Sequence, residues 1–158
     1  MRVRVVRTPH QLPLSRKIKG KIKRLDNMAP VFTAIGEDHV ETIQHRIASG
    51  VDFEGRELAP LSEMTIALRE WRGISRSSPL WETGRMKSSW RYYLRGRRGV
   101  TVKPNTYLDR KKVARDMYGG ASTKLRRPVP VRNPFSLSRE QILRYTQWVK
   151  WHVLGARR

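Results

Sequence analysis

The sequence contains no cysteine and no long hydrophobic run. Without cysteine, disulfides and thiolate metal sites are excluded, and a protein that is assembled inside the cell is favoured. No apolar run approaches the roughly 18 residues of a membrane span, so we expect no membrane partner. The N-terminus is basic but lacks the apolar stretch of a signal peptide.

Catalytic motifs are missing as well. The four histidines, at positions 10, 39, 45 and 152, include no pair at the i, i+4 spacing of a helical metal site. There is no glycine-rich phosphate loop, no G-x-S-x-G motif and no H-E-x-x-H motif. We therefore expect no enzymatic activity, no catalytic residue, no metal site and no cofactor.

Positive charge is abundant and unevenly distributed, with a net charge of +21. Residues 1–24 hold nine Lys or Arg and no acid, whereas residues 26–84 hold five against ten acids. Residues 85–127 hold 14 against two, and residues 128–158 hold six against one. Two basic regions thus flank a mildly acidic one, which implies an anionic partner. Nucleic acid, an acidic protein surface and an anionic membrane all fit the charge alone.

The longest predicted element is a helix over residues 28–48. Pro30 suits its first turn, and Gly50 suits its end. Residues recur at spacings of three and four and give one apolar stripe, formed by Met28, Phe32, Ile35, His39 or Val40, Ile43 and Ile47. We expect this helix, roughly 30 Å long, to be the element against which a sheet packs.

An antiparallel hairpin is predicted farther along the chain. Side chains alternate in character over residues 90–94 and again over residues 100–103, which is typical of strands. The RGRRG segment at 95–99 supplies a glycine-bearing loop with three arginines at its tip. The fold class is therefore α+β: a small antiparallel β-sheet packed against a long N-terminal helix, with shorter helices and a C-terminal helix.

The shorter elements are indicated by caps and prolines. Ser62 can cap a helix that runs to about Trp71, and Thr83 can cap one that runs to about Ser89. Residues 109–118 fit a third helix, with Val113, Ala114 and Met117 on its inner side. Three prolines make residues 128–134 an extended edge or connecting piece and not a central strand.

The C-terminal helix begins at a capping box formed by Ser138 and Gln141. It carries an apolar stripe, made of Ile142, Thr146, Val149 and Val153, and an adjacent aromatic stripe, made of Tyr145, Trp148 and His152. Either both stripes form one wide core face, or one meets the core and the other meets another subunit.

The chain divides into a basic N-terminal arm (1–27) and an α+β domain (28–158). In the arm, Ile18 and Ile22 suit a helix but Gly20 lies between them, so we expect a solvated arm. The alternatives are a nucleic-acid contact and an arm that becomes ordered against a neighbouring subunit. The candidates for facing an anionic partner or DNA are Arg95, Arg97, Arg98, Lys111, Lys112, Lys124, Arg126 and Arg127.

Four short elements, taken in order, resemble the phage virion morphogenesis (tail completion) family of tailed bacteriophages. They are GRELAPLSEMT at 55–65, LWETGRMKSS at 80–89, VARDMYGG at 113–120 and VPVRNPFSLS at 129–138. The likeness covers about residues 28–154. The sequence departs from the family pattern at Leu58, where the family often has Trp, at Val113, where it has Tyr, and at Ser136, where it has Gly.

The resemblance implies a structural subunit from the head–tail junction of a contractile-tailed phage, a tail completion, terminator or neck protein. The fold of such proteins resembles an antiparallel sheet packed on a long helix. Their subunits assemble as a homo-oligomeric ring, often a hexamer. The implied partners are the connector, tail tube and sheath, with passing contact to genomic DNA. The implied location is the virion, after assembly in the host cytoplasm. The candidates for the subunit interface are Trp148, Trp151, His152, Arg132 and Phe135.

The alternative hypothesis is a basic monomeric nucleic-acid-binding module. The net charge and the arginines of the hairpin tip favour it, because arms and hairpin loops commonly contact phosphates. No recognised nucleic-acid motif is present, and the aromatic residues of the first strand fit a core better than a base-stacking platform.

Overall fold

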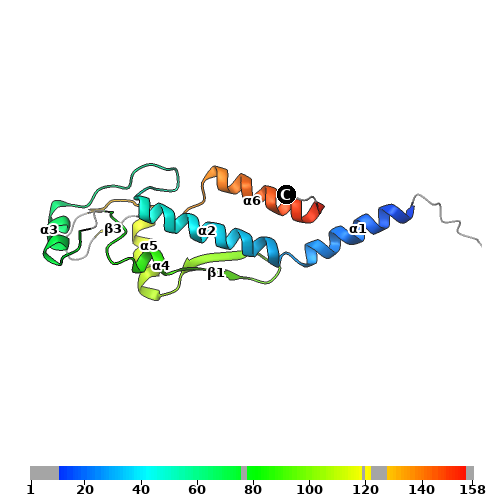
Figure 1. Cartoon of the computed structure of the whole chain (residues 1–158), viewed down its shortest axis with the longest axis horizontal. Helices are drawn as coiled ribbons and strands as arrows, with labels where there is room; N and C mark the ends of the chain where they lie inside the picture. The colour runs from blue at the N-terminus through cyan, green and yellow to red at the C-terminus, as the bar shows by residue number, and fades with distance from the viewer. Residues whose placement is uncertain (1–10, 76–77, 119, 122–127, 156–158) are drawn as a thin grey trace, which may run out of the picture.

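The computed structural model describes residues 11–75, 78–118, 120–121 and 128–155. The elements follow one another as α1 (Gln11–Asp26), α2 (Ala29–Ser49), α3 (Glu63–Trp71), α4 (Arg85–Ser88), β1 (Trp90–Leu94), β2 (Val100–Pro104), α5 (Tyr107–Tyr118), β3 (Gly120–Ala121), β4 (Pro128–Val129) and α6 (Arg139–Leu154). The fold is α+β, as the sequence predicts. The molecule is elongated, with α3 at one end of its long axis and α1 at the other (Figure 1).

The long helix α2 lies at the centre of the molecule. The β1–β2 hairpin packs on one side of it, and α6 lies along another side (Figure 1). Pro30 occupies the first turn of α2, and Gly50 ends the helix with a left-handed backbone, φ 72°, a conformation that glycine adopts without strain. The long helix predicted over residues 28–48 is confirmed.

The predicted hairpin forms between β1 and β2. Trp90 pairs with Pro104 at its open end, and Leu94 pairs with Val100 beside the tip. A second, very short antiparallel pair joins β3 to β4. The proline-rich segment therefore contributes only two residues to a strand, because proline donates no ladder hydrogen bond.

The hydrophobic core gathers around the C-terminal half of α2. Ile43 and Ile47 are fully buried, and Trp90 stacks on Phe135 with ring centroids 5.0 Å apart. The cluster is completed by side chains from three loops and helices, Leu58, Leu80 and Val113. A single core thus joins segments from almost the whole length of the domain.

Three local details differ from the sequence-based expectations. Residues 11–26 form helix α1 where a solvated arm was expected, although the side chains described there are mostly exposed. The helix α4 is capped by Gly84 in a left-handed conformation, and the hydroxyl of Thr83 accepts a hydrogen bond from the Arg85 amide. In α5, which begins at Tyr107, Val113 is buried but Ala114 is exposed.

Gly36 permits the close approach of α2 and the hairpin. A Cβ atom at this position would lie 2.7 Å from both Cβ and Cγ of Tyr92. Ala is a better helix former than Gly by about 1 kcal/mol, but the overlap costs about 1–3 kcal/mol through displaced packing. We therefore predict that Gly36→Ala lowers the free energy of unfolding by about 1 kcal/mol, measured by urea denaturation.

Gly20→Ala in α1 is the matched control. Its Cβ would meet only the tip of the Arg24 side chain, 3.8 Å away, so stability should be unchanged or raised. Equal losses in the two variants would contradict the assigned role of Gly36.

Candidate functional site

The guanidinium of Arg46, on α2, is buried where α6 begins. It donates hydrogen bonds to the carbonyl oxygens of Pro134, at 3.3 Å, and Ser136, at 2.8 Å. It also donates to Oε1 of Gln141, at 2.7 Å. Burial lowers the pKa of Arg46. The cation is thus held by neutral oxygen atoms that come from α6 and from the segment just before it.

A second polar link joins the same two helices. The hydroxyl of Tyr145 donates to Oδ2 of Asp38, at 2.6 Å, and accepts a hydrogen bond from Nε2 of Gln141, at 3.2 Å. Arg144 forms an ion pair with the same Asp38 oxygen. Burial, together with the neighbouring Asp38, raises the pKa of Tyr145 to about 12. Tyr145 therefore stays protonated and acts as a donor in a structural network.

His39 lies beside this network, with its ring edge-on to Tyr145 at a centroid distance of 6.5 Å. Burial, aided by the nearby charge of Arg46, lowers the pKa of His39 to about 4. The imidazole is therefore neutral in the folded protein near neutral pH. The arrangement holds α6 in place against α2.

The predicted basic residues occupy two separate places. Arg95, Arg97 and Arg98 are exposed at the hairpin tip, where Arg97 forms an ion pair with Asp26 of α1 at 3.2 Å. Lys111 is exposed on α5, which follows the other end of the hairpin (Figure 1). Lys112 is exposed there too, whereas Lys124, Arg126 and Arg127 lie outside the described residues. The tip is thus one basic site and α5 is another.

The C-terminal residues predicted for a subunit interface make contacts within the chain. Nε2 of His152 lies 2.8 Å from the carbonyl oxygen of Asn27 and 3.1 Å from that of Arg24. The ring of Trp148 packs against Tyr145, and Trp151 is half-buried. The aromatic stripe of α6 is therefore the one that faces α2 and the junction with α1.

The other two interface candidates also fasten the fold. The Arg132 guanidinium donates to the carbonyl oxygens of Ala59 and Pro60, at 2.8 Å each. Phe135 belongs to the core, with a 5% exposed side chain. Both residues hold the 129–138 segment against other parts of the chain.

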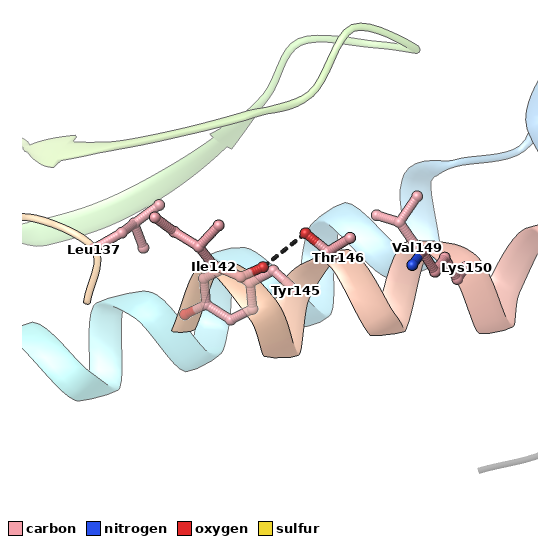
Figure 2. A pocket seen from close by; sticks show the side chains of 6 residues that line it. All are labelled: Leu137, Ile142, Tyr145, Thr146, Val149 and Lys150. Carbon is pink, nitrogen blue, oxygen red and sulfur yellow. Dashed lines mark hydrogen bonds between the residues drawn. The ribbon is translucent and has the colours of Figure 1, made fainter. Parts of the chain in front are cut away.

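The apolar stripe of α6, which the sequence offers as one of two faces for a subunit contact, is partly exposed. Ile142 is 51% exposed and Thr146 is exposed, whereas Val149 and Val153 are half-buried. A shallow hollow of about 350 Å³ follows this side of the helix (Figure 2), lined by Leu137, Ile142, Tyr145, Thr146, Val149 and Lys150. The sequence carried the signal, two stripes where one core face suffices, but not which stripe turns outward.

The part of the chain that the structure describes contains neither a cluster of metal-binding side chains nor a membrane-spanning helix. Within those residues, no group of three or more His, Asp or Glu side chains is placed to hold a metal ion. Over the same residues, no helix has the length and apolar character needed to cross a membrane. The described surface offers four features that could meet a partner: the basic hairpin tip, the exposed part of α6 and the exposed faces of α1 and α3.

We predict that Arg46→Ala lowers the free energy of unfolding by about 2–4 kcal/mol, because buried oxygen acceptors lose a charged donor. Urea denaturation measures this loss. Arg144→Ala is the control, since its ion pair with Asp38 is partly exposed and should be worth less than about 1 kcal/mol. An equal loss of unfolding free energy in Arg46→Ala and Arg144→Ala would contradict the central role assigned to Arg46.

We predict that stability falls as the pH drops from 6.5 toward 4. The pKa of His39 is lowered from 6.5 to about 4 on folding, so in this window the unfolded chain binds a proton that the folded chain excludes. The loss should reach about 3 kcal/mol. His39→Leu should remove this part of the pH dependence in denaturation curves, and identical slopes in the two proteins would refute it.

Comparison with known proteins adds no relative, since no family model, curated protein or solved structure matches this chain. The likeness to the tail-completion family therefore depends on the four sequence elements.

Proposed function

We propose that this chain is a structural subunit of a tailed-phage virion, a tail completion, terminator or neck protein. Copies of the chain form a ring, with a hexamer expected, that joins the tail to the head connector and leaves an axial channel for DNA. Its neighbours are the connector, the tail tube and the sheath of a contractile tail. The protein assembles in the host cytoplasm and ends in the virion.

The observation that carries this proposal is where the four family-like elements meet. Each contributes one buried side chain to the same hydrophobic cluster: Leu58, Leu80, Val113 and Phe135. The four elements are therefore parts of one folded unit and not of separate regions. Leu58 and Val113 stand where the sequence departs from the family pattern, so the shared core supports a common fold, and the resemblance itself depends on the order and spacing of the elements.

The same elements are fastened to one another by side chain to backbone hydrogen bonds. Arg132 in the fourth element holds the carbonyl groups of residues 59 and 60 in the first. Arg69 of α3 donates to the carbonyl oxygens of Ser78 and Pro79, just before the second. These arginines stabilise the packing of the loops, which is a structural role and suits a structural subunit.

The surface of the described chain favours an assembled state over an isolated monomer. Exposed large apolar side chains occur on α1, α3, α6 and the hairpin, among them Ile22, Met64, Trp71 and Leu143. Trp71 is 83% exposed and Met64 is 76% exposed. Extended apolar exposure of this kind marks contacts with other proteins.

The arginines of the hairpin tip suit an anionic neighbour, either acidic protein or DNA in the channel. They also support the second candidate function, a monomeric nucleic-acid-binding module. The two candidate functions differ in how binding responds to salt. Association through apolar surfaces resists salt, whereas the affinity of phosphate contacts falls steeply as the salt concentration rises.

We predict that the purified protein forms a closed oligomer with the mass of six 18.5-kDa chains. The oligomer should persist in 0.5 M salt, where charge interactions are screened beyond a distance on the order of 3–5 Å. Light scattering with and without duplex DNA measures this.

Replacing Arg95, Arg97 and Arg98 together with Gln should reduce any DNA binding and leave the melting temperature nearly unchanged, because all three side chains are exposed. A monomer that binds DNA with a steep salt slope would overturn the ring and favour the nucleic-acid module.

A further inference from the structure

The two ends of the molecule carry short amphipathic helices whose apolar faces point away from the core. Helix α3 lies at one end of the long axis, and α1 extends from the other (Figure 1). Because they are at opposite ends, these faces cannot meet within one chain. Each of them is available to a second copy.

The exposed face of α1 is apolar in the middle and basic on its sides. Ile18, Ile22 and Leu25 follow the i, i+4, i+7 spacing of one helical face and are each about half exposed, at 49%, 53% and 50%. Lys17 and Lys21 lie beside this stripe and are exposed as well. Between residues 16 and 24 the chain has six Lys or Arg and no acid.

The exposed face of α3 has an apolar stripe of the same length, with acidic residues along one side. Met64, Leu68 and Trp71 have the same i, i+4, i+7 spacing and are 76%, 46% and 83% exposed. Glu63 and Glu70 are exposed on one side of the stripe, about two turns apart, whereas Arg72 on the other side forms an ion pair with Glu82. The two faces therefore match in apolar length, and the glutamate side of α3 is complementary in charge to α1.

We propose that α1 of one copy packs along α3 of the next. The stripe of Ile18, Ile22 and Leu25 lies against that of Met64, Leu68 and Trp71. The two helices run antiparallel, because Lys17 and Lys21 then lie on the side of Glu63 and Glu70 of the neighbouring copy, as flanking charges do along paired helices. The basic N-terminal segment thus finds its anionic partner in the mildly acidic part of the same sequence.

A contact between two different surfaces of one chain is heterologous, so it builds a ring when the rotation closes and a filament when it does not. Three apolar side chains on each partner bury less area than a standard stable interface. The pairwise contact is therefore weak. Closing a ring, in which every copy uses both ends, strengthens it without any new kind of contact. The inference supplies the interface of the proposed ring and takes its biological meaning from that proposed function.

The absence of cysteine makes disulfide trapping a clean test. We predict that single-cysteine variants Ile22→Cys and Leu68→Cys, mixed as full-length proteins and oxidised mildly, form a mixed disulfide dimer. These positions are central in both stripes, so the test does not depend on whether the helices run parallel or antiparallel. Ile142→Cys is the matched control, an exposed apolar position on α6, and its yield with Ile22→Cys should be at least several-fold lower.

Charge reversal tests the flanks of the same contact. Glu63→Lys with Glu70→Lys in the Leu68→Cys chain should reduce trapping several-fold. Lys17→Glu with Lys21→Glu in the Ile22→Cys chain should restore it. Trapping no better than with Ile142→Cys, or unchanged by charge reversal, overturns the contact.

The chain that carries both Ile22→Cys and Leu68→Cys separates this inference from the proposed function. A closed ring of disulfide-linked copies supports both. An open ladder of ever longer products supports the contact and contradicts the ring. If the wild-type chain forms a ring but the double-cysteine variant does not cross-link, the contact is refuted and the ring remains.

Discussion

The buried guanidinium of Arg46 is the interaction on which the arrangement of the helices depends. A buried cation that lacks partners costs several kcal/mol, and every observed acceptor of Arg46 belongs to Gln141 or to the segment just before α6. Helix α2, that segment and α6 consequently fix one another. On its other side the same turn of α2 presents Ile43 and Ile47 to the core. One helix thus organises a polar seam and an apolar cluster.

Much of the fold could be predicted because its signals are local. The capping box of Ser138 and Gln141, the glycine that ends α2 and the alternation in the hairpin are each read within a few residues. Such signals depend on hydrogen-bond geometry that repeats in every protein. The α+β class and the central long helix followed from them.

The surfaces could not be predicted in the same way. Which stripe of α6 turns inward is decided by Gln141 and Tyr145, whose polar ends meet Arg46 and Asp38 about a hundred positions earlier in the chain. Periodicity carries no information about such a long-range match. Periodicity also does not show that Trp148 contacts Tyr145 and that His152 reaches the α1–α2 junction; the subunit interface expected at these two residues stays a prediction. In α1, the spacing of Ile18 and Ile22 proved a better guide than the glycine between them.

The molecule can be described as a frame with two complementary ends. The frame consists of α2, the hairpin and α6, and the ends are a basic amphipathic helix and an acidic one. A map of the oligomer by electron cryomicroscopy tests this account most directly. The map should show a closed ring with an axial channel, in which α1 of each copy lies along α3 of the next. Separate monomers spaced along DNA, with α1 and α3 both uncovered, would contradict it.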